Sequence, residues 1–259
     1  MNRQFTFLGT GSSIGVPVIG CKCSVCLSQD PKNNRLRAGA LLSLQGKKIL
    51  IDAGPDIRTQ ALTHKIDRLD AFILTHLHYD HVAGFDDLKI YSYIQENKKL
   101  PCMMLQEAWE GFKERHSYLM SSFSEDIPDS PFFSWHILQG TGGKVLFEGM
   151  DIEYLTYLQG GTKVLGLRIG NLAYITDIKD YEDEVLQRLQ GVEILIVSAI
   201  RPQKTSKNFS LQDALDFVEK VSPKKTYLTH MAHEIDYNLI QPTLPSDVYL
   251  AYDGLSFSF

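Results

Sequence analysis

Four side chains that can bind metal ions lie close together in residues 75–81, Thr-His-Leu-His-Tyr-Asp-His. They follow directly after a short apolar run, which is typical of a buried strand. Along an extended loop His76 and His78 should face the same side, while Asp80 and His81 can turn toward a neighbouring point. Imidazole and carboxylate groups are the ligands expected of Zn²⁺, and Mn²⁺ is also compatible. The spacing therefore predicts a site for one or two metal ions that could assist a hydrolysis.

A second group of possible metal ligands lies near the N-terminus. Cys21, Cys23 and Cys26 form the pattern Cys-x-Cys-x₂-Cys, and three thiolates this close can surround one zinc ion if a fourth ligand completes the tetrahedron. The alternative is three reduced thiols without a metal. Cys102 stands apart from them, and we expect it to be a packed core residue. Cysteines so few and so crowded do not indicate a disulfide framework.

Length and charge limit the possible functions. A chain of 259 residues can bury a sizeable core, and we expect a single domain over residues 1–259. The net charge of −5 argues against bulk binding to nucleic acid or to an anionic membrane. We see no signal peptide and no apolar run that approaches the ~20 residues of a membrane span. These features predict a cytoplasmic protein that acts on a small molecule.

Strands and helices are both predicted from the hydrophobic pattern. Short apolar or β-branched runs predict strands over 5–8, 40–44, 48–51, 71–74, 145–147, 152–158, 164–169, 172–175, 194–198, 226–228, 248–251 and 255–259. Apolar residues that recur every three or four positions predict helices over 57–64, 86–95, 107–120, 181–189 and 211–221, the last capped by Ser210. Residues 121–143 are rich in Ser, Pro, Asp and Gly and predict a surface loop. Two sheets covered by helices are the most economical arrangement.

With these features in place, the chain resembles the metallo-β-lactamase superfamily. The resemblance implies an α/β fold of four layers, an αββα sandwich whose metal ions lie at one edge of the two sheets. Other segments that resemble the superfamily lie before and after the first motif, in the expected order along the chain. They are Gly9-Thr10-Gly11, Ile51-Asp52-Ala53-Gly54-Pro55-Asp56, Tyr174-Ile175-Thr176-Asp177, Leu228-Thr229-His230 and Tyr252-Asp253-Gly254-Leu255.

Within the superfamily, the chain resembles the PhnP-like phosphodiesterases. That branch carries a Gly-Val-Pro segment and a cysteine cluster near the N-terminus. Here these are Gly15-Val16-Pro17 and the cysteines at 21, 23 and 26, followed by Arg35-Leu36-Arg37. The resemblance runs from Gly9 to Leu255 and weakens around residues 100–150.

The resemblance also implies the ligand sets. One ion would be bound by His76, His78 and a third histidine, and the other by Asp80, His81 and His230. Asp177 would bridge the two ions, and Asp80 would also orient the nucleophile. His233 would complete a structural zinc site with the three clustered cysteines, and such a site would contribute folding energy through its affinity for metal.

Two positions depart from the pattern of the branch. Gln159 stands where the third histidine is expected, and an amide oxygen is a weak, neutral ligand for zinc. Asn208 stands where a histidine could protonate the leaving group, and an amide cannot transfer a proton. Arg201 and Lys204 are the candidate contacts for a phosphate group, although both could equally be solvated loop charges.

The expected function is a metal-dependent hydrolase of a small or cyclic phosphodiester, acting through a metal-activated hydroxide, with zinc or manganese at the active site and one structural zinc. Two alternatives follow from Gln159 and Asn208: a divergent member that binds metal without hydrolysis, and a relative of PqqB in which one metal supports redox chemistry. A nuclease that processes tRNA is disfavoured because the chain is acidic. A β-lactam hydrolase is disfavoured by the cysteine cluster. The resemblance also allows a homodimer.

Overall fold

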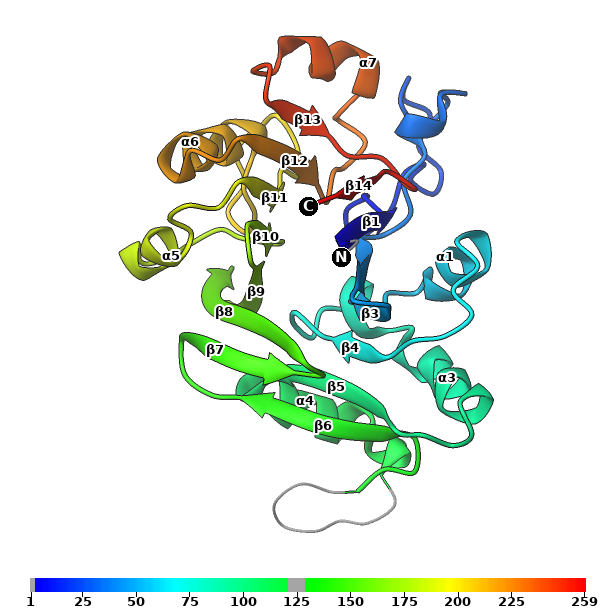
Figure 1. The fold of residues 1–259 in the computed structure, drawn as a ribbon. Helices are drawn as coiled ribbons and strands as arrows, with labels where there is room; N and C mark the ends of the chain where they lie inside the picture. Colours follow the sequence, from blue (N-terminus) through cyan, green and yellow to red (C-terminus); the bar gives the residue numbers. More distant parts are fainter. Residues whose placement is uncertain (1–2, 121–128) are drawn as a thin grey trace.

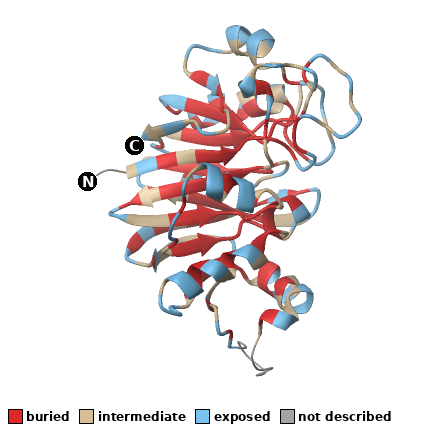
Figure 2. Cartoon of the chain, turned by 90° about the vertical axis from the view of Figure 1, so that its right-hand side faces the viewer, coloured by how far each residue is buried: buried red, intermediate tan, exposed pale blue. Residues whose placement is uncertain are grey.

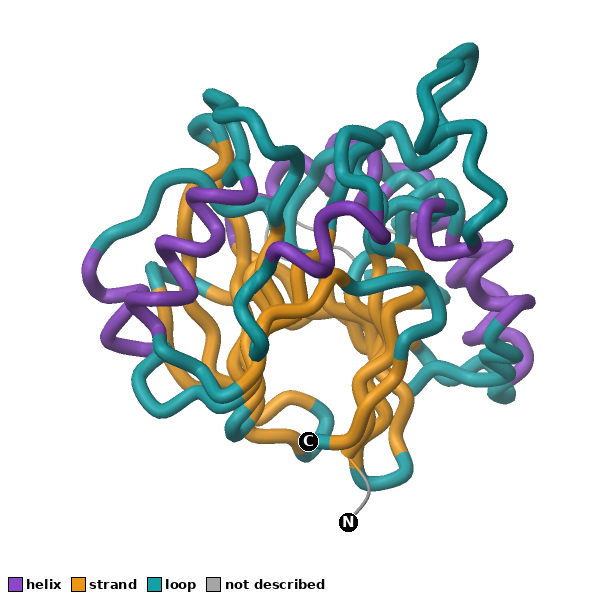
Figure 3. The backbone as a smooth tube through the Cα atoms, turned by 90° about the horizontal axis from the view of Figure 1, so that it is seen from above, coloured by secondary structure: helices purple, strands orange, loops and turns teal. Residues whose placement is uncertain are grey.

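A computed structural model of the protein describes residues 3–120 and 129–259. In this part of the chain, two sheets of seven strands face each other, and helices lie outside them (Figures 1 and 3). Helices α1, α3 and α4 lie beside the first sheet, whereas α5 and α6 lie beside the second (Figure 1). The predicted αββα sandwich is therefore confirmed.

The first sheet contains strands from the first half of the chain, closed by one strand from the C-terminus. In spatial order it consists of β14 (Ser256–Ser258), β1 (Arg3–Gly9), β2 (Gly39–Leu44), β3 (Lys47–Ile51), β4 (Ala71–Ile73), β5 (Leu100–Leu105) and β6 (Phe133–Leu138). The second sheet consists of β13 (Val248–Leu250), β12 (Lys225–Thr229), β11 (Ile194–Ser198), β10 (Leu172–Ile175), β9 (Thr162–Ile169), β8 (Met150–Gln159) and β7 (Gly142–Phe147).

The helices are short. They are α1 (Ile57–Thr63), α2 (Tyr79–Val82), α3 (Lys89–Ile94), α4 (Gln106–Arg115), α5 (Asp183–Arg188), α6 (Leu211–Val221) and α7 (Tyr237–Ile240), with 3₁₀ turns η1 (Pro31–Asn33), η2 (Phe85–Leu88), η3 (Ser117–Leu119) and η4 (Gln241–Thr243). Ser210 caps α6 as predicted: its hydroxyl accepts from the backbone N–H of Asp213, whose side chain accepts from the N–H of Ser210. None of the described helices has the length and apolar character needed to cross a bilayer.

The main hydrophobic core lies between the two sheets. Phe5 and Phe72 of the first sheet and Tyr174 and Ile196 of the second belong to one cluster of buried side chains. The buried residues follow the strands, while the exposed residues lie on the outer faces of the helices and on the loops (Figure 2). Strands β4, β10 and β11 pair in parallel and are buried along nearly their whole length, which explains why they appear in the sequence as nearly continuous apolar runs.

The prediction for residues 100–150 was wrong in part. Residues Leu100–Leu105 form β5, and Phe133–Leu138, which lie within the surface loop predicted over 121–143, form β6. The segment 121–128 of that loop lies outside the described residues. Pro101 has a low strand propensity, and β5 is held by parallel pairing with β4 on one side and with β6 on the other. The helix predicted over 107–120 ends at Arg115.

Asp253 joins three of the motifs that define the family resemblance. Its carboxylate accepts hydrogen bonds from the backbone N–H and the hydroxyl of Thr10, at 2.9 and 2.7 Å, and from the backbone N–H of Leu36 at 2.7 Å. The Gly-Thr-Gly loop, the Arg-Leu-Arg segment and the C-terminal turn are therefore held together. Met231, just after the last predicted histidine ligand, donates its N–H to the carbonyl of Thr10, so this assembly also supports the predicted metal site.

Candidate metal centre

The predicted ligands are delivered by the carboxyl ends of neighbouring strands. The motif that contains His76 follows β4, Asp177 follows β10 and His230 follows β12. Because β10, β11 and β12 are parallel, their ends meet at one edge of the second sheet. A hydrogen bond from the N–H of Leu165 in β9 to the carbonyl of Thr75 joins this edge to the first sheet. Segments far apart in sequence are thus brought to one place.

Three residues at these strand ends have a left-handed backbone. The φ angles are 62° for Asp52, which follows β3, 56° for Asp177 and 57° for His230. A non-glycine residue in this region carries a strain of roughly 1–3 kcal/mol, and such strain often accompanies functional sites. The bend aims each side chain across the strand ends, which is the direction needed for the side chains to converge.

Asp80, His81, Asp177 and His230 form one side of the centre. Nε2 of His230 lies 3.2 Å from Asp80 and 3.3 Å from Asp177, and Nε2 of His81 lies 3.3 Å from Asp80 and 3.2 Å from Asp177. All four side chains are buried. Two carboxylates and two imidazole nitrogens that share one small buried space are a suitable ligand set for a divalent cation.

His76 and His78 form the other side. Nε2 of His76 lies 3.0 Å from Nδ1 of His78, and a ligand atom of His76 lies within 4.8 Å of ligand atoms of both His81 and Asp177. Thr75 contacts Nδ1 of His76 at 2.9 Å and so fixes the orientation of the ring. The two histidines therefore present one nitrogen each toward the same space, with Asp177 between this space and the first side.

The charges of the centre are strongly coupled. Burial favours the neutral forms of these groups and by itself would lower the pKa of His81. The charges of Asp52 and Asp177 outweigh this effect and raise the pKa of His81 well above its usual value. Burial likewise opposes ionisation of Asp177, yet the neighbouring His230 and His81 hold the pKa of that carboxyl below its usual range. Burial lowers the pKa of His76 well below its usual value. The carboxylates therefore favour a positive charge in this space, and a divalent cation can supply it.

The close fit of α2 against the 53–54 segment fixes the position of Asp80. A Cβ atom on Gly54 would lie 2.0 Å from the carbonyl oxygen of Asp80, so only glycine allows this approach. The N–H of Ala53 donates to the carbonyl of His81 at 2.8 Å. The Asp-Ala-Gly-Pro segment therefore acts as a rigid support for two of the predicted ligands.

Gln159 and Asn208 both bind the same oxygen of Asp177. The side-chain amide of Gln159 donates to Oδ1 at 2.6 Å and that of Asn208 at 3.1 Å. Both residues are buried, and the amide oxygen of Gln159 has no hydrogen-bond partner among the described residues. A buried lone pair without a donor is costly unless a cation or a water molecule meets it. Gln159 is therefore placed to offer a weak ligand at the His76/His78 side.

We expect Gln159→His to tighten binding of the weaker of two ions. An imidazole supplies a better nitrogen ligand than an amide, and the change in affinity should match or exceed the ~10–100-fold effects of residues that merely support ligands. Isothermal titration of metal-free protein with Zn²⁺ measures both affinities. The wild type should show one tight and one weak ion at this centre, whereas two equally tight ions would mean that Gln159 is an adequate ligand.

Asp52 supports the centre without belonging to the predicted ligand sets. Its carboxylate lies 2.7 Å from Nδ1 of His81 and accepts from the N–H and the hydroxyl of Thr75, both at 2.8 Å. This contact fixes which nitrogen of His81 faces the centre. In the sequence this segment stands out only by its family resemblance, although a polar residue directly after a buried strand is itself a signal of a functional residue.

Replacing Asp52 with asparagine should therefore weaken metal binding at the His81 side about 10–100-fold, since residues that orient a metal-binding histidine have effects of this size. Asp67→Asn is the matched control, because Asp67 forms an exposed ion pair with Lys48. Competition with a chromogenic chelator reports the affinities. Equal affinities for Asp52→Asn and the control would show that His81 needs no such support.

The four predicted structural ligands also come together. The Sγ atoms of Cys21, Cys23 and Cys26 lie 3.3, 3.5 and 3.4 Å from Nδ1 of His233. The backbone N–H of Cys26 donates to Cys23 and lowers the pKa of that thiol to about 6. Three sulfur atoms at nearly equal distance from one ring nitrogen match the donor set of a closed zinc site. Its role as a zinc site stays a prediction.

Arg35 holds the two parts of this cysteine–histidine cluster together. The guanidinium is buried and donates to the carbonyls of Ala232 and Ile235, at 3.3 and 2.8 Å, and to the side chain of Asn33 at 3.1 Å. The first two acceptors flank His233 in sequence. Arg35 therefore fixes the chain around His233 even before any ion is bound.

The two predicted phosphate contacts differ in their surroundings. Arg201 forms an ion pair with Glu234 at 3.3 Å, and its side chain is partly exposed. Lys204 is exposed on the same loop. Cys102 is buried in the core, as expected. The role of Arg201 and Lys204 in binding a substrate stays a prediction.

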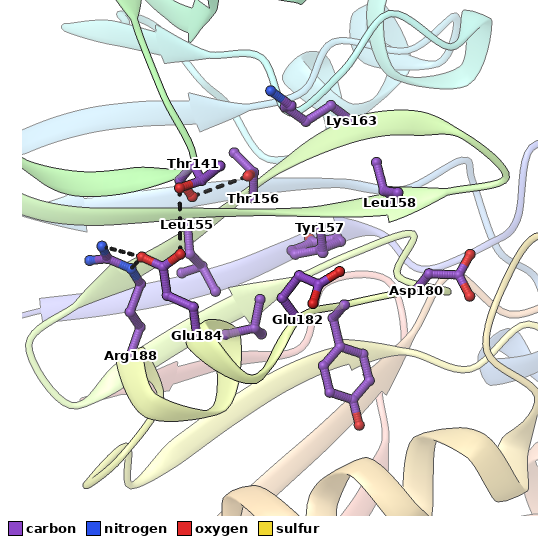
Figure 4. A pocket seen from close by; sticks show the side chains of 12 residues that line it. Thr141, Leu155, Thr156, Tyr157, Leu158, Lys163, Asp180, Glu182, Glu184 and Arg188 are labelled. Atoms are coloured by element: carbon purple, nitrogen blue, oxygen red, sulfur yellow. Dashed lines mark hydrogen bonds and ion pairs between the residues drawn. The ribbon is translucent and has the colours of Figure 1, made fainter.

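A separate pocket lies between β8 and α5 (Figure 4). It has a volume of about 240 Å³ and includes none of the predicted metal ligands. Its two cations are already paired, Arg188 with Glu184 and Lys163 with Glu107. This pocket therefore offers no unpaired cation to an anionic ligand within the described structure, and we place the chemistry at the strand ends.

Comparisons with known proteins agree with the geometry. Residues 47–231 match a family described as beta-lactamase superfamily domain. The crystal structure of a new diphosphatase from the PhnP family superposes with a TM-score of 0.90 and 31% identity, covering 99% of this chain and 98% of that chain.

Two curated relatives cover less of their own length. Octanoyltransferase of Porphyromonas gingivalis is 31% identical over 261 residues, which are 96% of this chain and 50% of that protein. Ribonuclease Z of Methanopyrus kandleri is 35% identical over 88 residues, which are 32% of this chain and 26% of that protein. The chain thus spans half the length of the first relative and matches a quarter of the second.

Proposed function

Because the chain belongs to the metallo-β-lactamase superfamily, in its PhnP-like branch, we propose that it is a metal-dependent hydrolase of a small phosphodiester. The observation that carries the proposal is the convergence of Asp80, His81, Asp177 and His230 in one buried space, with His76 and His78 beside it. The cysteine–histidine cluster supports assignment to the same branch. The proposed metals are zinc or manganese at this centre and one structural zinc.

The donor set fits divalent cations at two neighbouring positions. His76 and His78 would hold one, assisted by Gln159, and Asp80, His81 and His230 the other, with Asp177 between them. Bound cations would polarise a phosphoryl oxygen and lower the pKa of a nearby water molecule. The other steps of the reaction would depend on the side chains around the centre.

Asp80 would orient the attacking water. Its carboxylate is buried and lies within 3.3 Å of the imidazoles of both His81 and His230. Burial alone would raise the pKa of Asp80, but hydrogen bonds from these histidines hold it below its usual range. A carboxylate with so low a pKa accepts a hydrogen bond from water and directs its lone pair, rather than retaining the proton.

Asn208 cannot protonate the leaving group. Its amide instead donates to Asp177 and keeps that carboxylate in position. General-acid assistance, which contributes about 10²–10⁴-fold where it is present, is therefore missing from this position. The proposed enzyme should work best on esters whose leaving group is stable as an anion.

A diphosphate substrate is the second candidate. The observation that favours it is the 31% identity, over nearly the whole chain, to a diphosphatase of the PhnP family. A phosphate leaving group is acidic and needs little protonation, which suits Asn208. The transferase name belongs to a protein of which the chain spans half, and we carry no acyl-transfer activity over to it.

A substrate panel tests the proposal. Metal-loaded protein is assayed with bis(p-nitrophenyl) phosphate, an alkyl p-nitrophenyl phosphate, inorganic diphosphate and a nucleoside diphosphate. We expect release of p-nitrophenol from the diesters, and Asn208→His should lessen the dependence on leaving-group acidity. Turnover of diphosphates alone would select the second candidate. Bound metal without any turnover would instead favour the non-hydrolytic or PqqB-like alternative.

A further inference from the structure

The loop that follows β11 carries three cations beside the candidate centre. They are Arg201, Lys204 and Lys207. Arg201 is engaged by Glu234, whereas the two lysines are exposed and form no ion pair with any residue that the structure describes. A lysine without an ion pair can attract a substrate that carries a phosphodiester charge.

Lys207 is the lysine whose position is defined by packing. A Cβ atom built on Gly160 would lie 3.1 Å from Cγ and 3.5 Å from Cδ of Lys207. The aliphatic stem of this lysine therefore crosses the turn between β8 and β9, directly beside Gln159. A lysine whose aliphatic stem packs against a neighbour still keeps its ammonium group in water.

Both neighbours of this stem contact the centre. Gln159 precedes Gly160 and donates to Asp177 at 2.6 Å, and Asn208 follows Lys207 and donates to the same oxygen at 3.1 Å. The stem of Lys207 thus packs beside the neighbour of Gln159, and Lys207 itself precedes Asn208, so both amides that reach the carboxylate predicted to bridge the ions adjoin this lysine.

The loop itself is closed by hydrogen bonds. The hydroxyl of Thr205 donates to the carbonyl of Asn208 at 2.7 Å and accepts from its N–H at 3.0 Å. The N–H of Phe209 donates to the carbonyl of Ile178, next to Asp177, at 2.9 Å. These bonds hold the loop backbone on both sides of Lys207. Less backbone entropy is therefore lost when Lys207 binds an anion than for a lysine on a free loop.

We infer that the ammonium group of Lys207 binds a phosphoryl oxygen of the substrate at the rim of the centre. This inference rests on the proposed function. The sequence singled out Arg201 and Lys204, but the packing against Gly160 and the ion pair of Arg201 favour Lys207. A contact made equally in the bound substrate and in the transition state lowers KM and leaves kcat nearly unchanged.

Lys207→Ala is the test, with Lys207→Arg as the conservative variant and Lys98→Ala as the matched control. Lys98 is exposed and lies before β5, at the end of the parallel strands opposite to the centre. KM and kcat for bis(p-nitrophenyl) phosphate and the dissociation constant for inorganic phosphate are measured for each metal-loaded protein. Metal content is measured alongside.

We expect Lys207→Ala to raise KM and the dissociation constant for phosphate about tenfold, the size expected when a hydrogen bond to a charged group is lost. Lys207→Arg should recover most of the affinity, and all variants should keep their metal and nearly the same kcat. Phosphate binding by Lys207→Ala equal to that of the wild type would overturn the inference. Wild-type protein that binds phosphate but shows no turnover would refute the proposed hydrolysis. It would not refute the role of Lys207, because phosphate binding by the variants still tests that role.

Discussion

Replacing Asp177 with alanine should reduce phosphodiester hydrolysis by at least about 10³-fold, because the several kcal/mol that metal ions contribute to a transition state would be lost with them. Asp177 is a carboxylate that lies near both sides of the centre. Its oxygens lie within 3.3 Å of His81 and His230, and its ligand atoms group with His76 as well. Without it, neither side retains its bridging oxygen, and metal content should fall together with the rate.

Two further variants separate the charge of Asp177 from its place in the fold. Asp177→Asn should also lose metal, yet it should fold normally, because asparagine tolerates the left-handed φ of 56° at this position. Asp180→Ala should behave like the wild type, since Asp180 is an exposed residue just after the same strand. Metal content by mass spectrometry and initial rates are measured in parallel. An Asp177→Ala protein with full metal and an unchanged rate would contradict the assignment.

The second large effect is expected at the cysteine cluster. Cys23→Ser should remove one zinc ion per chain and lower the Tm by about 5–10 °C, given about 2–4 °C per kcal/mol for a domain of this size. Zinc that binds only the folded chain stabilises it, and here it would tie the N-terminal loop to the segment around His233. Hydrolysis at low temperature should persist, because Cys23 contacts no predicted ligand of the other centre.

Cys102→Ala is the control for this experiment. Cys102 is buried in the core and lies outside the cluster, so its loss should leave the zinc count unchanged. Differential scanning calorimetry and zinc analysis are run on the same samples. If thiol reagents titrate all three clustered cysteines of the native wild type rapidly and no zinc is released, the cluster is not a metal site.

Much of the architecture could be predicted because it is encoded locally. The apolar runs of β3, β4, β10, β11 and β12 mark buried parallel strands, and the polar residues that follow them mark the edge at which the centre forms. The histidine–aspartate motif and the three cysteines are dense enough in sequence to predict ligands without knowledge of the fold. Strands β5 and β6 could not be predicted, because their stability comes from pairing with distant residues.

The orientation of the side chains could not be predicted from the sequence. Gln159 and Asn208 could be recognised as departures from the family pattern, but not that both amides converge on one oxygen of Asp177. The ion pair of Arg201 with Glu234 and the packing of Lys207 on Gly160 likewise depend on contacts between segments that are distant in sequence. Such contacts are set by the tertiary fold, and the residues themselves are unremarkable in the sequence.

The most direct test of the central claim is the rate of bis(p-nitrophenyl) phosphate hydrolysis while protein stripped by a chelator is titrated with Mn²⁺ or Zn²⁺. We expect no turnover without metal. Activity should rise with the ions bound and level off when the His76/His78 side, weakened by Gln159, is filled. Turnover that is independent of metal, or a centre filled with metal that never hydrolyses the ester, would contradict the proposed metal-dependent hydrolysis.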